Sequence, residues 1–202
     1  LAEKALADMG LRFDLTLPLC RYFANNRSRL RMPFKVIQIG RVYRAERPQK
    51  GRLREFYQCD IDIIGDSSKE SEIELIHTTA KTLQALGFDD FTVRINDRRI
   101  LFDLIQSAGF AGEDVLSVCI SFDKLDKIGI DGVRAELQEK AYPAEAIDGF
   151  LASVSADEAG VEGMLDYCSD RRIIEELKAV IDSVASLSGG SYRIEYDKSL
   201  VR

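Results

Sequence analysis

Residues 40–65, GRVYRAERPQKGRLREFYQCDIDIIG, predict a β-hairpin whose connecting loop is strongly charged. The segments KVIQIGRVYR (35–44) and FYQCDIDIIG (56–65) are rich in β-branched and aromatic residues, as strands are. The connection between them, AERPQKGRLRE (45–55), is longer than the roughly two to five residues of an ordinary hairpin loop. Long loops in compact domains are often functional, and a basic one is a candidate for binding phosphate.

Strand alternation gives the second strand two different faces. One face carries an aromatic ring, an amide and two carboxylates: Phe56, Gln58, Asp60 and Asp62. The other face is expected to pack in the core, and the thiol of Cys59 with it: Tyr57, Cys59, Ile61 and Ile63. The polar row suits a ligand that carries an ammonium group or an imidazole.

The loop supplies the complementary charge. It begins after Arg44 and contains two acidic residues, Glu46 and Glu55, and four basic ones: Arg47, Lys50, Arg52 and Arg54. A guanidinium binds phosphate oxygens bidentately and also stacks on a base, so adenine could lie between Phe56 and an arginine. The alternative is an exposed hairpin tip with surface ion pairs worth about 1 kcal/mol or less each. The residues alone leave both interpretations open.

Charge is distributed unevenly along the 202 residues, although the net charge is only −6. Residues 1–54 hold 13 Lys and Arg against 4 Asp and Glu, and residues 55–202 hold 15 against 30. A basic end on an acidic chain indicates a local anionic partner, such as nucleotide phosphate or RNA. A solvated basic face is the plainer alternative.

Composition excludes several classes of protein. No apolar run approaches the roughly 18 residues of a membrane helix, and the start does not resemble a signal peptide, so we expect no membrane partner. The four cysteines are far apart and His77 is the single histidine, so we expect no zinc site. Unpaired thiols of this kind fit a cytoplasmic protein.

The remaining sequence is mostly helical. Thr16 followed by Leu17 and Pro18 predicts the start of a helix, with Thr16 as N-cap. A helix is predicted from Ser67 to Gly87, a strand over 91–95 and a helix over 98–108. Residues 112–187 lack strand alternation and predict several short helices, with breaks near Gly129, Gly132, Pro143 and Gly160. YRIEYDKSLVR (192–202) returns to an extended pattern.

The hairpin resembles motif 2 of class II aminoacyl-tRNA synthetases, in the form typical of histidyl-tRNA synthetases. The resemblance rests on Arg44-x-Glu-Arg, PQKGR and FYQ, and extends to RFDLT (12–16), INDRRIL (95–101), FDKLDK (122–127) and SLVR (199–202). It implies an α+β fold: a partial class II aminoacyl-tRNA synthetase antiparallel sheet flanked by helices, with a helical insertion domain. The implied domains are a catalytic core fragment (1–111), the insertion (112–187) and a return to the core (188–202).

The resemblance also implies roles for individual residues. Arg44 and Arg202 would be catalytic, acting on the α-phosphate of ATP. The ATP-binding residues would be Arg44, Glu46, Arg52 and Phe56, with Mg²⁺ carried on the phosphates and no dedicated protein site for the metal. The histidine-binding residues would be Asp14, Thr16, Gln58 and Asp62. Structural alternatives stay open for three of these: Thr16 as a helix cap, Asp14 as a turn residue, and Asp62 as the partner of an arginine.

The implied function is ATP-dependent activation of histidine to histidyl-adenylate and its transfer to tRNA(His) by a cytoplasmic homodimer. Motif 1, motif 3 and an anticodon-binding domain are not found, so we expect the 202-residue chain alone to have little or no ligase activity. One alternative is a non-catalytic relative that serves as the regulatory subunit of ATP phosphoribosyltransferase. Others are a basic hairpin that binds RNA only, and a class II synthetase for another amino acid.

Overall fold

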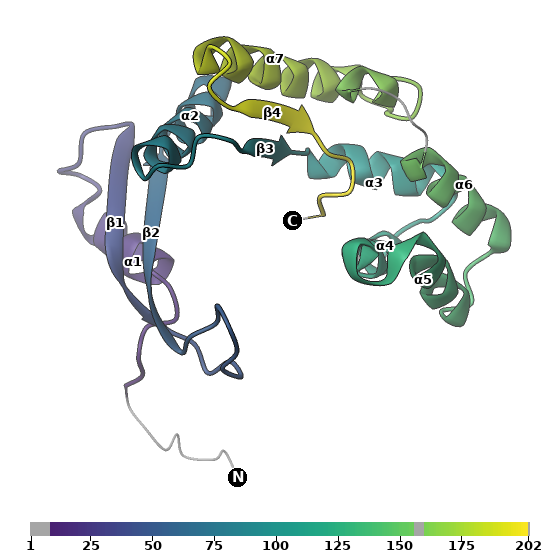
Figure 1. The fold of residues 1–202 in the computed structure, drawn as a ribbon, viewed down its shortest axis with the longest axis horizontal. Coiled ribbons are helices and arrows are strands. Elements are labelled where there is room, and N and C mark those ends of the chain that lie inside the picture. The colour runs from purple at the N-terminus through teal and green to yellow at the C-terminus, as the bar shows by residue number, and fades with distance from the viewer. Residues whose placement is uncertain (1–8, 156–159, 202) are drawn as a thin grey trace. The chain divides into compact units, whose positions relative to one another are not determined.

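The structure, a computed structural model, describes residues 9–155 and 160–201. By its internal contacts the chain divides into two compact units, Leu1–Ser71 and Glu72–Arg202 (Figure 1). None of the helices in the described part of the chain is long and apolar enough to cross a bilayer. All four cysteines are free thiols, two of them exposed and two buried.

The first unit consists of a helix and the predicted hairpin. Helix α1 spans Thr16–Asn26, and strands β1 (Phe34–Tyr43) and β2 (Glu55–Ile64) pair antiparallel. The register runs from Phe34 opposite Ile64 to Tyr43 opposite Glu55 and places Gly40 opposite Gln58. The two strands and the long connection predicted from the sequence are therefore confirmed.

Helix α1 covers one face of this hairpin. Leu15 before the helix and Leu19 within it are buried, as is Val42 on β1. The ring of Phe34 contacts Tyr22 and Phe23 on the helix, with ring centroids 6.2 and 6.1 Å apart. The sheet face that the helix covers is the one that carries Phe34, Val42, Phe56 and Gln58.

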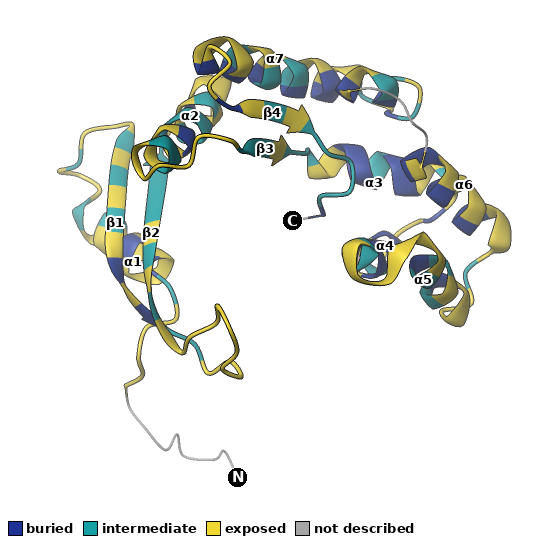
Figure 2. Cartoon of the chain, viewed as in Figure 1, coloured by how far each residue is buried: buried dark blue, intermediate teal, exposed yellow. Residues whose placement is uncertain are grey.

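The other hairpin face corrects a prediction from the sequence. Alternation divides the strands as expected, and exposed and partly buried residues alternate along β1 (Figure 2). On the face predicted to be core, Tyr57 is 65% exposed and Cys59 is exposed as well, as are Ile37 (64%) and Ile39 (72%) on β1. Ile61 and Ile63 on the same face are only partly buried. Core packing of Cys59 was therefore wrong for this structure. Alternation decides which residues share a face, but a face becomes core only where another element packs on it.

The second unit contains two short strands and a series of helices. Helix α2 spans Lys69–Ala85, β3 spans Thr92–Ile95, and α3 spans Arg98–Ser107. The predicted helical segment contains α4 (Asp114–Phe122), α5 (Leu125–Glu139), α6 (Ala144–Ser155), a 3-10 turn (Val161–Met164) and α7 (Arg171–Ser188). Strand β4 (Arg193–Tyr196) pairs parallel with β3, which the long helical crossover between them permits.

Two clusters of apolar residues hold this unit together. The larger lies between α3, α4, α5, α6 and α7, and its aromatic centre is formed by Phe110, Phe122 and Phe150. The smaller joins α2 and α7 to the strands through Ala80, Val180, Val184 and Tyr192. His77 on α2 contacts a residue of this smaller cluster, with Nδ1 3.0 Å from the Tyr192 hydroxyl.

A carboxylate fixes the start of α7 to α3. Asp103 Oδ2 accepts hydrogen bonds from the Ser169 backbone N–H at 2.9 Å, the Ser169 hydroxyl at 2.8 Å and the Cys168 thiol at 3.2 Å. Burial raises the pKa of Asp103, but the donors from Ser169 and Cys168 outweigh it, so the pKa lies below its ordinary value. Burial and the same contact raise the pKa of Cys168 to about 11, so this thiol stays protonated at neutral pH.

Replacing Asp103 by Asn is expected to lower the free energy of unfolding at pH 7 by about 1–2 kcal/mol, because charged hydrogen bonds are lost. The folded-state pKa lies below the unfolded value, so the stabilisation is complete above about pH 4 and disappears as pH falls through the folded pKa. Urea unfolding at pH 3 to 7 should therefore show the two proteins converging in acid. The exposed Asp89→Asn serves as control, and a difference independent of pH would contradict the assignment.

Candidate active site

The long hairpin loop is more ordered than its length suggests. The Arg44 N–H donates to the Arg54 carbonyl at 2.9 Å, which extends the ladder one step beyond the strands. At the tip, Gln49 and Arg52 exchange two backbone hydrogen bonds of 3.3 and 2.8 Å. The turn between them needs Gly51, whose φ of +78° is readily adopted by glycine. The backbone of the basic loop is therefore fixed by hydrogen bonds at its base and at its tip.

The segment before α1 is fastened to the hairpin beside this loop. The Tyr43 N–H donates to the Arg12 carbonyl at 2.9 Å, and Arg12 Nε donates to the Arg41 carbonyl at 2.6 Å. Gly40 makes the approach possible, because a Cβ at that position would lie 2.7 Å from Arg12 Nη2. Phe13 and Asp14 are in this way held next to the start of the loop.

Arg44 lies on the same sheet face as Gln58, as the register requires. Its guanidinium carbon is 4.4 Å from the ring centroid of Phe13 and 5.1 Å from that of Phe56. Its Nε also donates to the Phe13 carbonyl at 3.4 Å. Among the described residues no carboxylate forms an ion pair with Arg44, so its terminal N–H groups can bind an anion.

The neighbouring arginines differ in this respect. Arg41 points to the opposite face and pairs with Glu55 at 3.0 Å, and Arg52 pairs with Glu46 at 3.3 Å. The Arg41–Glu55 and Arg52–Glu46 pairs are exposed, so each contributes little stability. Arg54 Nε donates to the Glu46 carbonyl at 3.2 Å and thereby fixes the backbone that carries the acidic residue.

A hollow of about 350 Å³ opens beside Arg44. Its lining contains all four residues predicted to bind ATP, together with two others: Arg44, Glu46, Gly51, Arg52, Leu53 and Phe56. The volume lies in the lower part of the range typical of small-ligand sites. Gly51 and Leu53 were not predicted as lining residues, and their place in the loop between Glu46 and Phe56 was the available signal.

The predicted histidine-binding residues on β2 continue the same face. The Gln58 amide donates to both oxygens of Asp60 at 3.3 and 3.4 Å. Its Oε1 is buried and has no hydrogen-bond partner among the described residues. Asp62 accepts from the Gln38 amide at 3.5 Å. Sequence reasoning overlooked Gln38, although its position opposite Asp60 could have suggested it.

The residues before α1 correct a second prediction. Thr16 is the first residue of α1, the N-cap position belongs to Leu15, and no side chain caps the helix from there. Asp14 Oδ1 instead accepts from the Leu17 N–H at 3.4 Å. Asp14 therefore serves the turn, whereas the exposed Thr16 does not cap the helix as predicted. Arg202, the second predicted catalytic residue, lies outside the described residues.

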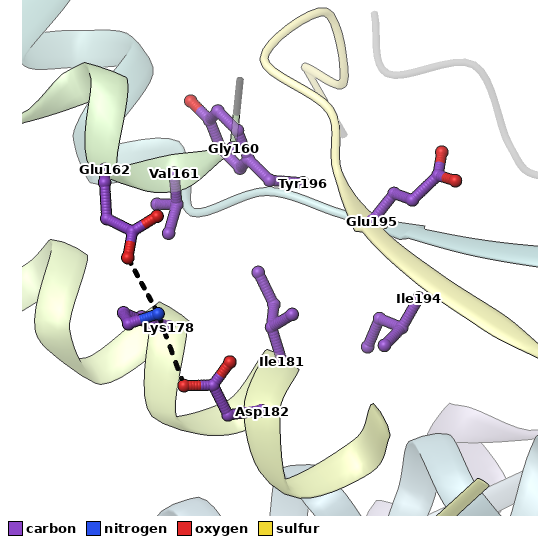
Figure 3. A pocket seen from close by; sticks show the side chains of 9 residues that line it. All are labelled: Gly160, Val161, Glu162, Lys178, Ile181, Asp182, Ile194, Glu195 and Tyr196. Atoms are coloured by element: carbon purple, nitrogen blue, oxygen red, sulfur yellow. Dashed lines mark ion pairs between the residues drawn. The ribbon is translucent and has the colours of Figure 1, made fainter. Parts of the chain in front are cut away.

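A second hollow, of about 390 Å³, lies in the other unit (Figure 3). Lys178 spans two carboxylates there, Glu162 at 2.8 Å and Asp182 at 3.4 Å. Val161, Ile181 and Ile194 form its apolar part. None of the residues predicted from the sequence to bind a ligand lines it. No cluster of three or more potential metal-binding side chains occurs in the described parts of either unit.

Comparison with known proteins identifies relatives of the whole chain. The model of a family described as histidyl-tRNA synthetase matches residues 2–202. A histidine–tRNA ligase of Leifsonia xyli is 48% identical, over 98% of this chain and 48% of the relative. A histidine–tRNA ligase of Aeropyrum pernix is 40% identical, over 96% of this chain and 44% of the relative. The chain thus spans about half the length of the curated relatives it matches.

Solved structures share the fold. A crystal structure of histidyl-tRNA synthetase from Nostoc sp. PCC 7120 superposes with a TM-score of 0.80 at 28% identity, covering 95% of this chain and 46% of that one. A structure from Bacillus halodurans, described as an ATP phosphoribosyltransferase regulatory subunit/histidyl-tRNA synthetase, gives a TM-score of 0.77 at 18% identity. It covers 94% of this chain and 49% of that one, and at this identity shows the fold alone.

Proposed function

This chain belongs to the histidyl-tRNA synthetase family, and we propose from this premise that the full-length protein is a histidine–tRNA ligase. The fold is accordingly a class II aminoacyl-tRNA synthetase fragment of the α+β class. The observation that carries the proposal for this chain is the arrangement at Arg44. The Arg44 guanidinium, which has no carboxylate partner among the described residues, lies at a hollow of about 350 Å³. It shares its sheet face with Gln58, whose Oε1 has no hydrogen-bond partner within the same described part of the chain.

ATP is the proposed occupant of the hollow. Phe56 supplies a ring on which adenine can stack, and Arg44 and Arg52 supply charge for the phosphates. Glu46, which is paired with Arg52, is proposed to accept from the adenine amino group or to orient that arginine. We propose Arg44 and Arg202 as catalytic residues on the α-phosphate. Mg²⁺ would be held by the phosphates and would supply further positive charge there.

Histidine is the proposed neighbour on β2. An α-ammonium group would satisfy the buried Oε1 of Gln58, which otherwise lacks a donor and is costly to leave so. Asp14 and Thr16 would complete the ammonium site, and Asp62 would face the imidazole. The amide contact of Asp62 with Gln38 fixes the carboxylate without neutralising it, which favours this role over a structural ion pair.

The first reaction proceeds by attack of the histidine carboxylate on the α-phosphorus, which forms the mixed anhydride and releases pyrophosphate. An α-carboxyl group has a pKa near about 3.5, so it is ionised at neutral pH and needs no general base. The barrier arises from bringing two anions together. Arg44, whose guanidinium contacts the rings of Phe13 and Phe56, is proposed to neutralise charge on the α-phosphate.

The second reaction would transfer histidine to the terminal ribose of tRNA(His). The exposed cations of residues 45–54 are the proposed neighbours of the acceptor end. We further propose that residues 112–187 form an insertion domain between core segments 1–111 and 188–202. The full-length protein is proposed to act as a cytoplasmic homodimer.

A second candidate is a regulatory relative without catalysis, which the name of the Bacillus halodurans structure suggests. The structure from Bacillus halodurans is only 18% identical, whereas the named ligases reach 48%. The terminal N–H groups of Arg44 form no ion pair among the described residues and lie beside a hollow of about 350 Å³, which suits an enzyme that binds an anionic substrate there. The observations at Arg44 therefore favour the ligase.

The deciding experiment is ATP–pyrophosphate exchange with the purified full-length protein and each of several amino acids. Exchange that depends on histidine alone, followed by charging of a tRNA(His) transcript, is the expected result. Exchange with another amino acid would point to a different class II synthetase. Binding of ATP without any exchange would favour the regulatory alternative, and RNA binding independent of both substrates would favour an RNA-binding module.

A further inference from the structure

We infer that Phe13 is a positioning residue for Arg44, and that it holds the guanidinium ready for the α-phosphate before ATP binds. This inference rests on the proposed function and extends it to a residue outside motif 2. It assigns to Phe13 no contact with the substrate. Its action passes through the ring, which lies under the guanidinium, and through the backbone carbonyl, which accepts from Nε.

The exposure of Phe13 separates this role from core packing. Its side chain is 59% exposed, although the ring lies 4.4 Å from the Arg44 guanidinium carbon. Phe56, the other ring at this arginine, is farther away at 5.1 Å and is less exposed. An exposed phenylalanine that lies against a charged group contributes little to a core, whereas its π-face attracts the cation.

Two contacts from one residue constrain the guanidinium more than either would alone. The ring limits the tilt of the guanidinium plane, and the Nε hydrogen bond to the Phe13 carbonyl at 3.4 Å limits its rotation. The ring contact leaves the terminal N–H groups free. An arginine held in this way loses less side-chain entropy when an anion binds, so less of the binding energy is spent on ordering.

Phe13 can act as a support because its own backbone is fixed. Arg12 on one side makes two hydrogen bonds to β1, to the Tyr43 N–H at 2.9 Å and to the Arg41 carbonyl at 2.6 Å. On the other side Leu15 is buried against the hairpin. The support is therefore anchored at both ends, through contacts that do not involve Arg44.

The arrangement also explains why a second ring is needed. Adenine is proposed to stack on Phe56, and a base on the same face of that ring would displace the guanidinium from it. Phe13 would then be the aromatic contact that remains to Arg44. The two rings would thus have different roles, one for the base and one for the arginine.

Steady-state exchange with the full-length protein tests this inference, with the rate expressed per active site titrated by adenylate formation. Phe13→Leu is expected to lower kcat per titrated site about fivefold, the upper value for the loss of an exposed cation–π contact. Phe13→Tyr retains the ring and should stay within about threefold. Tyr22→Leu removes an aromatic ring that contacts Phe34 and not Arg44, and it should leave the rate unchanged. Partial unfolding would reduce the number of sites but not the rate at each site.

A positioning role differs from a merely structural one because the effect of Phe13→Leu on the exchange rate should depend on whether residue 44 is arginine. In an Arg44→Lys background, Phe13→Leu should cost less than about twofold, because the planar guanidinium it supports is gone. Equal losses in both backgrounds would overturn the inference, as would wild-type rates for Phe13→Leu.

A measurement without catalysis keeps the two proposals distinguishable. In protein labelled with ¹⁵N-arginine, the Arg44 Nε–H resonance, assigned by its loss in Arg44→Lys, should carry a ring-current shift that Phe13→Leu abolishes. If the wild type shows no histidine-dependent exchange, the proposed function fails, and this resonance still decides the positioning of Arg44. An Arg44 resonance that Phe13→Leu does not move would refute it.

Discussion

Arg44→Ala is expected to slow histidine-dependent ATP–pyrophosphate exchange by about 100- to 1000-fold, the usual cost of removing a preorganised donor from charge that builds in a transition state. The expectation follows from the position of the guanidinium, which contacts the rings of Phe13 and Phe56 and lies beside the hollow. Because the Arg44 side chain forms no ion pair in the described structure, its removal leaves no buried carboxylate without a partner. The loss should therefore appear in activity and not in the midpoint of urea unfolding.

Arg41→Ala is the matched control for this prediction. It removes the same side chain three residues earlier, on the opposite face of the hairpin, where Arg41 contacts Glu55 and the Tyr57 hydroxyl. Exposed contacts of this kind contribute about 1 kcal/mol or less, so exchange should change little. If both variants lost activity equally, the effect would reflect total basic charge, and the assignment of Arg44 would be wrong.

Local patterns predicted the hairpin well because they depend on neighbours in the chain. Alternation placed Phe56, Gln58 and Asp62 on one face, and the observed register brings that face together with Arg44. The residues predicted to bind ATP likewise meet at one hollow, because a single loop carries most of them. Which hairpin face would be covered was not predictable, since this depends on the position of α1 and not on the strands.

Contacts between distant segments left no local signal. Phe13 and Arg44 are 31 residues apart in the sequence, and their stacking depends on Arg12 reaching β1 across Gly40. The donors from Ser169 to Asp103 come from 66 residues away. The prediction that Thr16 caps α1 failed for a different reason. Asp14 and Thr16 both suit a helix start, and tertiary contacts decide which of two such neighbours accepts the hydrogen bond. Residue type identified the chemistry at these positions, but not the partner.

Phe150→Ala is expected to have the largest effect on stability, lowering the free energy of unfolding of the second unit by about 3–5 kcal/mol. Phe150 is fully buried, and its ring meets Phe122 edge-on with centroids 5.1 Å apart and Phe110 at 6.5 Å. Truncation would remove the ring at the centre of this group and leave a cavity among helices that are fixed by their other contacts. Such cavities collapse only in part, because well-packed side chains cannot follow the lost volume.

Phe88→Ala provides the same substitution at an exposed site of the same unit. Phe88 is 58% exposed, so its loss should cost less than about 0.5 kcal/mol. Urea unfolding followed by far-UV circular dichroism would compare the two variants, with Phe150→Leu expected between them because it retains part of the volume. Since α3, α4 and α6 contribute buried residues to the same core cluster as Phe150, Phe150→Ala should also increase hydrogen exchange in all three helices together. Equal midpoints for the two alanine variants would show that the three rings do not form the centre of this core.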